Sequence, residues 1–485
     1  MDTLSIRTLS GRSTEIDASS LQSFRAGLQG ELLTPDQPAY EEARQIWNAM
    51  IERRPAAILR CAAVDDITRA VDFARTHCLL TSVRGGGHNI AGSALCEQGL
   101  MIDLSQMKSV QIDPEQRTAQ VEPGATLADF DREAQKHGLA TPLGINSTTG
   151  VAGLTLGGGF GWLTRKYGVT VDNLIGAELI TANGQRVRAS ERENADLFWG
   201  IRGGGGNFGI VTRFEFRLHP VGPEVTAGLV VFPFDQASAV LHQYPALAQS
   251  QSDETVLWVV LRHAPPLPFL PTEAHGQKIL VIAFFSIAPT EETERQLNAV
   301  RALGQPLGEH VGPMPYSAWQ QAFDPLLTPG VRNYWKSHFF AKLDSGLLDV
   351  LLDFSSRLPS PHCEIFLGQL GGQASRVPVD ATAYSHRDAE FGMNVHGRWE
   401  TAAEDTHCVA WCRDLFSATK PYATGGVYVN FLSQDEVDRT PSAYRPDTWN
   451  RLVALKGKWD PQNLFRMNQN IQPKVQETRE EPAHV

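Results

Sequence analysis

The chain has 485 residues, of which 42% are hydrophobic and 20% are charged, so a large core is available and a disordered chain is excluded. Acidic residues outnumber basic ones by 54 to 43, and no dense Lys/Arg cluster offers the basic face that nucleic acid requires. The length suits two or three domains. Glycine is unusual, because many of the 42 glycines are clustered.

Residues 1–49 are expected to form a polar, irregular extension with a first helix in AYEEARQIWNAM. The first residues contain no positively charged segment followed by an apolar run, so we expect no secretory signal and a cytoplasmic location. No uncharged apolar stretch approaches the roughly 18 residues that a membrane helix needs.

The six cysteines are sparse and form no CxxC motif, which favours a reducing compartment. Cys408 and Cys412 are one helical turn apart beside His407, but no second pair of ligands accompanies them. The pattern favours buried thiols over a metal site.

The segment after residue 56 predicts a βαβ unit. AAILRCAA is typical of a buried strand, Asp65 and Asp66 can cap the helix that follows, and LLTSVR predicts a second strand running into a glycine loop. Three short strands follow, in LMIDLSQM, SVQIDP and TAQVEPG.

Later residues of the same region give clear start and stop signals. A helix is expected to begin at Thr126 and end at Gly138, and Asn183-Gly184 predicts the turn of a β-hairpin. A second helix is expected to begin at Ser190 and to be followed by the alternating strand IVTRFEFRLHPV.

The composition changes at residues 219–225. Beyond that point, strands such as VLWVVLRH and KILVIAFF alternate with helices such as TEETERQLNAVRALG. We therefore expect residues 222–420 to form a second domain, an antiparallel sheet backed by helices.

Three glycine clusters stand out. The cluster at 203–209 contains a formal G-x-G-x-x-G, but a helix precedes it and a strand follows, which is the reverse of a nicotinamide-binding Rossmann motif. The cluster at 85–87 follows a buried strand, so its N–H groups can converge on an anion such as a diphosphate; a flexible surface turn is the alternative. His88 beside it can act as a hydrogen-bonding group, a base or a nucleophile.

Four motifs in order resemble one family. RGGGHN, GVAGLTLGGGFGWLTRKYG, DLFWGIRGGGGNFGIVTRFEFRL and the C-terminal YVNFL with NQNIQP are similar to the berberine bridge enzyme-like FAD-linked oxidases of the vanillyl-alcohol oxidase superfamily. The resemblance implies an α+β fold with a two-lobed FAD-binding domain (50–221), a substrate-binding domain (222–420) and a C-terminal segment (421–485) that returns to the FAD-binding domain. Residues 222–420 resemble the family only in outline.

The resemblance implies FAD bonded covalently through the 8α carbon of the flavin to His88. Relatives with a second covalent bond carry a cysteine just before GVAGLTLGGG, where this chain has Asn146-Ser147-Thr148, so a single link is predicted. The resemblance implies the following cofactor-binding residues: Arg84, Gly85, Gly86, Gly87, His88, Asn89, Gly92, Gly153, Gly157, Gly158, Gly159, Ile210, Val211, Tyr428, Asn430, Asn468 and Asn470.

The implied activity is hydride transfer from a small alcohol, sugar or amine to flavin N5 and then to oxygen. A dehydrogenase that uses another acceptor, or an inactive flavin-binding protein, remains the alternative. The partners expected are therefore a small-molecule substrate and oxygen.

The resemblance implies a Tyr or Glu as catalytic base, often a tyrosine of a Y-x-N-[YF] segment, and Tyr428 is the one tyrosine in this chain's YVNF, so it is the first candidate. A phenol with a pKa near ~10 needs a partner to act as a base, so Tyr428 can equally pack on the flavin and only hydrogen-bond. Tyr384, His386 and His396 are expected to be structural, in strands. Phe366 and Trp399 are expected to line the substrate pocket.

Overall fold

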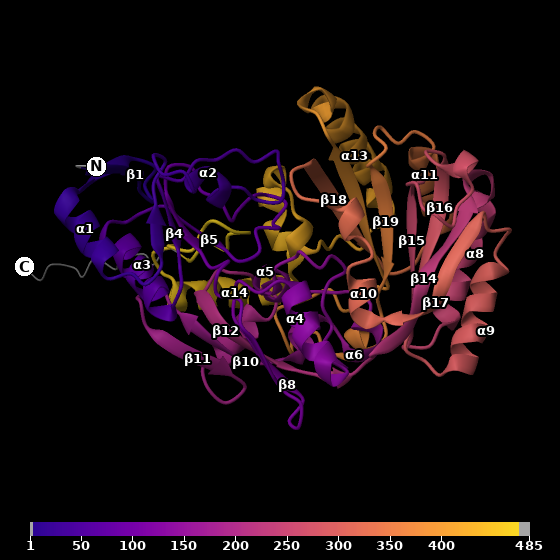
Figure 1. Cartoon of the computed structure of the whole chain (residues 1–485), viewed down its shortest axis with the longest axis horizontal. Coiled ribbons are helices and arrows are strands. Elements are labelled where there is room, and N and C mark those ends of the chain that lie inside the picture. The colour runs from indigo at the N-terminus through magenta and orange to yellow at the C-terminus, as the bar shows by residue number, and fades with distance from the viewer. Residues whose placement is uncertain (1–2, 475–485) are drawn as a thin grey trace, which may run out of the picture.

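The computed structural model describes residues 3–474, which form two lobes side by side (Figure 1). The N-terminal lobe contains a four-stranded sheet in the order β3-β4-β6-β5, in which β4 and β5 both run parallel to β6. Its elements are β3 (Glu31–Leu33), β4 (Ala57–Arg60), α3 (Val64–Thr76), β5 (Thr81–Arg84) and β6 (Leu100–Asp103). The expected βαβ unit is confirmed.

The expectation of an irregular N-terminal extension is wrong. The segment forms a hairpin and a helix, and the expected helix further on shrinks to one turn: β1 (Thr3–Arg7), β2 (Ser13–Asp17), α1 (Ala18–Ala26) and α2 (Tyr40–Ala43). Leu4, Ile6 and Ile16 alternate with polar residues and are buried in the same core as α3. The mostly polar composition hid this short period-2 pattern.

A second sheet of the N-terminal lobe has the order β11-β10-β12-β8-β7. Its strands are β7 (Val110–Asp113), β8 (Thr118–Val121), β10 (Leu174–Ile180), β11 (Arg186–Ser190) and β12 (Ile210–Arg217). The turn at Asn183-Gly184 is confirmed, with Gly184 at φ +80°.

Of the two helices beside this sheet, one begins where it was expected and the other begins later. Thr126 caps α4 (Leu127–Ala134) as expected, and the chain leaves its last turn at Gly138 with φ +62°. The helix expected at Ser190 begins later, as α7 (Ala195–Ile201), because the Ser190 hydroxyl instead accepts the backbone N–H groups of a turn.

The C-terminal lobe is a seven-stranded antiparallel sheet in the order β17-β14-β16-β15-β19-β20-β18, as expected. Helices cover one face, and the other face turns toward the N-terminal lobe (Figure 1). The strands are β14 (Glu224–Pro233), β15 (Thr255–His263), β16 (Lys278–Ser286), β17 (Gly308–Pro315), β18 (Arg332–Phe340), β19 (Glu364–Gln369) and β20 (Phe391–Trp399). The covering helices are α8 (Ala237–Ser250), α9 (Thr290–Arg301), α11 (Ser345–Ser355) and α13 (Asp405–Thr419).

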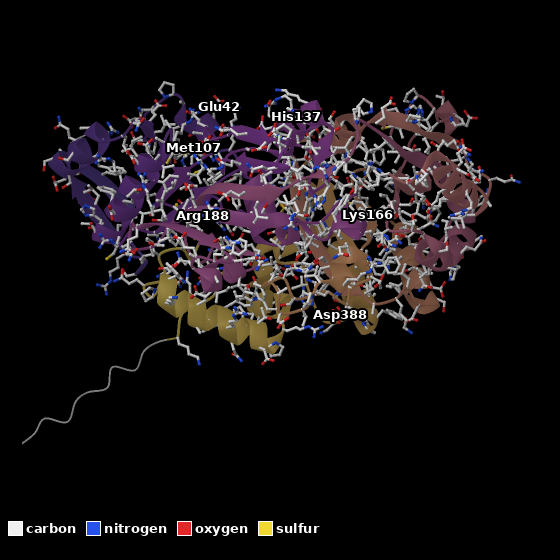
Figure 2. The ribbon with its side chains drawn as sticks, turned by 90° about the horizontal axis from the view of Figure 1, so that it is seen from below. Glu42, Met107, His137, Lys166, Arg188 and Asp388 are labelled. Atoms are coloured by element: carbon white, nitrogen blue, oxygen red, sulfur yellow. The ribbon has the colours of Figure 1, made fainter. Side chains whose placement is uncertain are left out.

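The last described residues return to the N-terminal lobe. Helix α14 (Pro446–Trp459) lies along the outside of the molecule, where Figure 2 shows it as the gold helix at the lower edge. Residues 460–474 then pack against the N-terminal lobe, where Leu464 and Phe465 join the core around α3 and Arg466 donates to the Leu9 carbonyl. Within residues 3–474, no helix is both long and apolar enough to span a bilayer.

Candidate cofactor and substrate site

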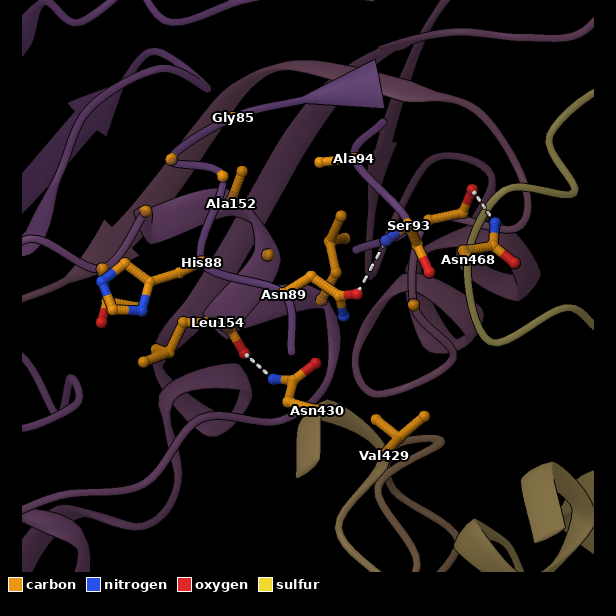
Figure 3. A pocket seen from close by; sticks show the side chains of 18 of the residues that line it. Gly85, His88, Asn89, Ser93, Ala94, Ala152, Leu154, Val429, Asn430 and Asn468 are labelled. Carbon is orange, nitrogen blue, oxygen red and sulfur yellow. Dashed lines mark hydrogen bonds between the residues drawn. The ribbon is translucent and has the colours of Figure 1, made fainter. Parts of the chain in front are cut away.

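A cavity lies between the two lobes. It is lined by the glycine loop after β5, by α5 (Val151–Leu156), by the start of β12, by residues 428–431 and 465–469, and by the inner face of the large sheet. Figure 3 shows His88 and Asn89 on one side of this space and Asn430 and Val429 on another. Eleven of the expected cofactor-binding residues line it: Gly85, Gly86, Gly87, His88, Asn89, Gly153, Ile210, Val211, Tyr428, Asn430 and Asn468.

The other expected residues do not line this cavity. A Cβ at Gly157, Gly158 or Gly159 would overlap the side chain of a neighbouring residue. The neighbours are, in the same order, Asn430, Tyr384 and Thr170. These three glycines therefore allow close packing within the protein. Gly92 packs in the same way on Ile51, and Asn470 also lies outside the lining.

Arg84 supports the glycine loop from behind. Its guanidinium donates to both carboxylate oxygens of the buried Asp103, at 2.9 and 2.5 Å, and to the carbonyl oxygens of Ala43 and Gln45. A bidentate pair of this kind fixes geometry as well as charge. Arg84 therefore holds the end of β5 and the start of the loop in place.

The glycine loop presents a row of free amides. Among residues 3–474, the backbone N–H groups from Gly85 to Asn89 donate to no protein acceptor. Gly86 lies so close to Gly150 that any side chain there would overlap the backbone. Unpartnered N–H groups in a glycine loop suit the pyrophosphate of a dinucleotide.

Two further observations fit FAD. Gly153 and Gly206 line the cavity, and no protein atom lies within 4 Å of where their Cβ atoms would be. The side-chain oxygen of Asn468 is buried at the cavity with no protein partner in the described chain, so it is free to accept a ligand N–H. The residues present therefore match the cofactor that the sequence resemblance implies.

The imidazole of His88 is oriented by a hydrogen bond and is neutral. Its Nε2 is 2.8 Å from the Thr148 hydroxyl, which itself donates to Asn146 Oδ1 at 2.6 Å. Because that hydroxyl proton is already used, Nε2 is the donor and Nδ1 keeps its lone pair. Burial, and then the positive charge of Arg398, lower the pKa of His88 to about 3, so the ring is neutral at physiological pH.

Aromatic residues surround the end of the cavity next to the large sheet. Trp47, Phe160, Trp258, Trp335 and Phe431 line it, and sequence reasoning identified none of them. Two come from strands in which inward and outward residues alternate, but the alternation alone does not tell which face meets the cofactor. Phe366 lies there as expected.

Trp399 is not a wall of the pocket, which corrects the expectation. It lies on the helix-covered face of the sheet, fully buried, and its Nε1 donates to Asp405 at 2.7 Å. Phe366, in β19, lies on the opposite face, so the two rings cannot line one pocket.

Tyr428 lies in the cavity, but its hydroxyl oxygen accepts two hydrogen bonds, from Gly159 N–H (3.0 Å) and Asn430 Nδ2 (2.9 Å). Burial raises the pKa of Tyr428 to about 12, against the opposing effect of these two donors. A phenol that stays protonated at neutral pH is a poor base. This geometry favours a positioning role.

Of the residues expected to be structural, Tyr384 and His386 lie in the loop before β20 rather than in strands, and neither lines the cavity. His396 does line it, on β20. Its Nδ1 is 2.8 Å from the carboxylate of Glu364, a residue that no sequence motif indicated.

Comparison with known proteins agrees with this geometry. Residues 55–190 match the model of the FAD binding domain family, and residues 427–472 match the family described as berberine and berberine like. An FAD-linked oxidoreductase of Dictyostelium discoideum is 30% identical over 93% of this chain and 96% of that protein. (R)-6-hydroxynicotine oxidase of Paenarthrobacter nicotinovorans is 30% identical over 92% of this chain and 97% of that protein.

Solved structures share the fold. 6-Hydroxy-D-nicotine oxidase from Arthrobacter nicotinovorans superimposes with a TM-score of 0.83 at 27% identity, over 92% of this chain and 98% of that one. Xylooligosaccharide oxidase from Myceliophthora thermophila C1, solved with xylobiose, gives 0.82 at 24% identity, over 94% and 99%. The expected fold class is confirmed, and this chain is an FAD-linked oxidoreductase of the berberine bridge enzyme-like family.

Proposed function

We propose that the chain is an oxidase whose FAD is attached covalently, through Nδ1 of His88 alone. The observation that carries this proposal is the neutral, oriented imidazole of His88 at the end of a loop of unpartnered amides. Its substrate is a small alcohol, sugar or amine, and oxygen takes the electrons. The names of the relatives, which include a hydroxynicotine oxidase and a xylooligosaccharide oxidase, support this range.

The chain's residues divide the work of binding. The amides of Gly85 to Asn89 bind the pyrophosphate, and Asn468 Oδ1 accepts a ligand N–H. Bound FAD would supply a hydride acceptor, the N5 atom of its flavin. The aromatic walls exclude water from the place where the substrate meets it.

A single covalent link follows from the residues opposite His88. The segment Asn146-Ser147-Thr148 offers no thiol, and no cysteine occurs between residues 97 and 362. The side chains of Asn146 and Thr148 instead orient the imidazole.

Acid precipitation tests the covalent link. Wild-type holoenzyme is expected to give a yellow pellet, and His88→Ala a colourless pellet with the flavin in the supernatant. Flavin released from the wild-type protein would contradict the proposal, as would a yellow His88→Ala pellet.

The electron acceptor and substrate need a separate test. Peroxide release in air is measured with (R)-6-hydroxynicotine, xylobiose and glucose, and compared with reduction of an artificial dye under nitrogen. Release of peroxide at a rate matching substrate consumption supports an oxidase. Turnover with the dye alone would show a dehydrogenase, the alternative activity.

Thr148→Val is expected to slow covalent attachment without preventing FAD binding. The variant loses the hydroxyl that fixes the Nε2–H tautomer, so a smaller fraction of His88 presents a free Nδ1. We expect attachment to slow about tenfold, the equivalent of one hydrogen bond of about 1.4 kcal/mol. The rate is measured as acid-stable flavin against time after FAD is added to apoprotein.

Ser147→Ala is the control for this experiment, because the Ser147 side chain bonds Asp324 and not His88. Equal attachment rates in wild type and Thr148→Val would show that the hydroxyl does not orient His88.

A further inference from the structure

The inner face of the large sheet carries a row of three side chains next to the cavity. Glu364 of β19 and Trp335 of β18 are the cross-strand neighbours of His396 on β20. Side chains directly opposite on adjacent strands lie close enough to interact. The rings of Trp335 and His396 stack, with centroids 4.7 Å apart and planes 19° apart.

Glu364 fixes the imidazole of His396. One carboxylate oxygen is 2.8 Å from His396 Nδ1, and the other accepts from Arg262 at 2.6 Å. Burial raises the pKa of the Glu364 carboxyl, but Arg262 and His396 outweigh it and lower that pKa to about 2. Glu364 is therefore an acceptor, so His396 Nδ1 donates to it, and in the neutral imidazole the lone pair is on Nε2.

His396 Nε2 is available to a ligand. In residues 3–474 no protein group bonds it, and His396 lines the cavity. Glu364 does not line the cavity. Both of its carboxylate oxygens already accept hydrogen bonds, one from Arg262 and one from His396. The nitrogen of His396, and not the carboxylate behind it, is thus the basic atom that a substrate can reach.

Ring contacts close around the space in front of His396. Going round, the centroid distances are 4.7 Å (Trp335 to His396), 6.0 Å (His396 to Phe366), 4.9 Å (Phe366 to Trp258), 6.4 Å (Trp258 to Phe160), 5.9 Å (Phe160 to Phe431) and 5.5 Å (Phe431 to Trp335). Such walls suit a flat ring, whereas a sugar needs many hydrogen-bonding groups. Besides His396 Nε2, the ring offers Trp335 Nε1, a buried donor with no protein partner in the described part of the chain.

We propose that His396 is the catalytic base, positioned by Glu364, and that the substrate carries a flat ring next to the alcohol or amine that is oxidised. This rests on the proposed oxidase function. The substrate O–H or N–H proton passes to His396 Nε2, and the electron pair of that bond forms the new C=O or C=N bond. The adjacent C–H bond breaks with its electron pair leaving as hydride to FAD. Hydride and proton together supply the two hydrogens of the peroxide formed from oxygen.

The charged groups facing His396 are Glu364, Arg262 and Arg398, and all three are held in protein contacts. Among residues 3–474, Tyr428 and His88 are the other ionisable side chains that line the cavity, and His88 stacks on Trp47, which contacts Trp335. The single carboxylate that touches His396 gives the imidazolium formed by proton transfer a partner.

The test uses holoenzyme and a phenol whose ionised form is coloured, 4-nitrophenol, at a pH below its own ionisation. Wild type is expected to bind it and to show the nitrophenolate absorption band. His396→Gln is expected to lose the band while keeping the flavin. His386→Gln is the matched control, because that imidazole lies outside the cavity lining. Glu364→Gln is expected to weaken the band, and added imidazole to restore it in His396→Ala.

Three results would overturn the proposal: no binding of 4-nitrophenol to wild type, binding to wild type without the nitrophenolate band, or an equal band in His396→Gln. For any probe that reduces the flavin anaerobically, His396→Gln is also expected to slow reduction about 100-fold or more. Because acid-stable flavin and peroxide release are measured without 4-nitrophenol, failure here is distinguishable from failure of the oxidase proposal.

Discussion

Gly153→Leu is expected to abolish FAD binding while leaving the protein folded. Gly153 lies in α5 with open space around its missing side chain, and that space is the cavity. A leucine there would occupy the volume that the cofactor needs. The protein should not lose stability, because leucine is favoured over glycine inside a helix by up to about 0.8 kcal/mol.

Gly457→Leu provides the control. Gly457 also lies inside a helix, α14, also with no atom within 4 Å of its Cβ position, but it does not line the cavity. Purified Gly153→Leu should contain less than about a tenth of the wild-type flavin, a loss of at least about 1.4 kcal/mol of binding. Gly457→Leu should contain the full amount. Normal flavin content in Gly153→Leu would show that FAD lies elsewhere.

Among the proposed substitutions, Lys456→Met is expected to lower the free energy of unfolding the most. The Lys456 ammonium is fully buried and donates to Asp460 (2.7 Å), to the Asn207 carbonyl (2.8 Å) and to the Phe465 carbonyl (2.9 Å). Methionine would leave the Asp460 carboxylate buried without its cation. Removing one partner of a buried pair costs about 3–5 kcal/mol, which denaturant unfolding of the holoenzyme would measure.

The neighbouring Lys458→Met separates this effect from a general effect of removing lysine. Lys458 is on the same helix and pairs with Asp196, but its side chain is 60% exposed. An exposed ion pair contributes at most about 1 kcal/mol. Equal losses in the two variants would contradict the role assigned to Lys456. Because Phe465 lines the cavity, Lys456→Met should also lower the fraction of the protein that acquires FAD.

Local signals in the sequence were enough for many elements. Thr126 with Asp129 caps a helix, Asn183-Gly184 makes a hairpin turn, and IVTRFEFR alternates as a half-buried strand, because each pattern depends on residues close in the chain. The N-terminal hairpin was missed because its apolar face consists of only a few residues, such as Leu4, Ile6 and Ile16.

The residues of the site likewise separate into those that a local motif identifies and those that only the folded chain brings together. The glycine loop and His88 could be predicted, since they are contiguous and resemble a known motif. Trp47, Trp335 and Glu364 could not, because their place in the site depends on how the two lobes meet and how strands β18, β20 and β19 pair. The alternation along β20 places His396 and Trp399 on opposite faces, but only the assembled sheet shows which face meets the cavity.

Peptide mass spectrometry distinguishes attachment of the flavin through His88 alone from every other arrangement. Trypsin should release the segment 85–108, between Arg84 and Lys108, and this peptide contains His88. This peptide from holoenzyme is expected to be heavier by one FAD, with fragmentation placing the flavin on His88. An unmodified peptide 85–108, or flavin found on another peptide, would contradict attachment through His88 alone.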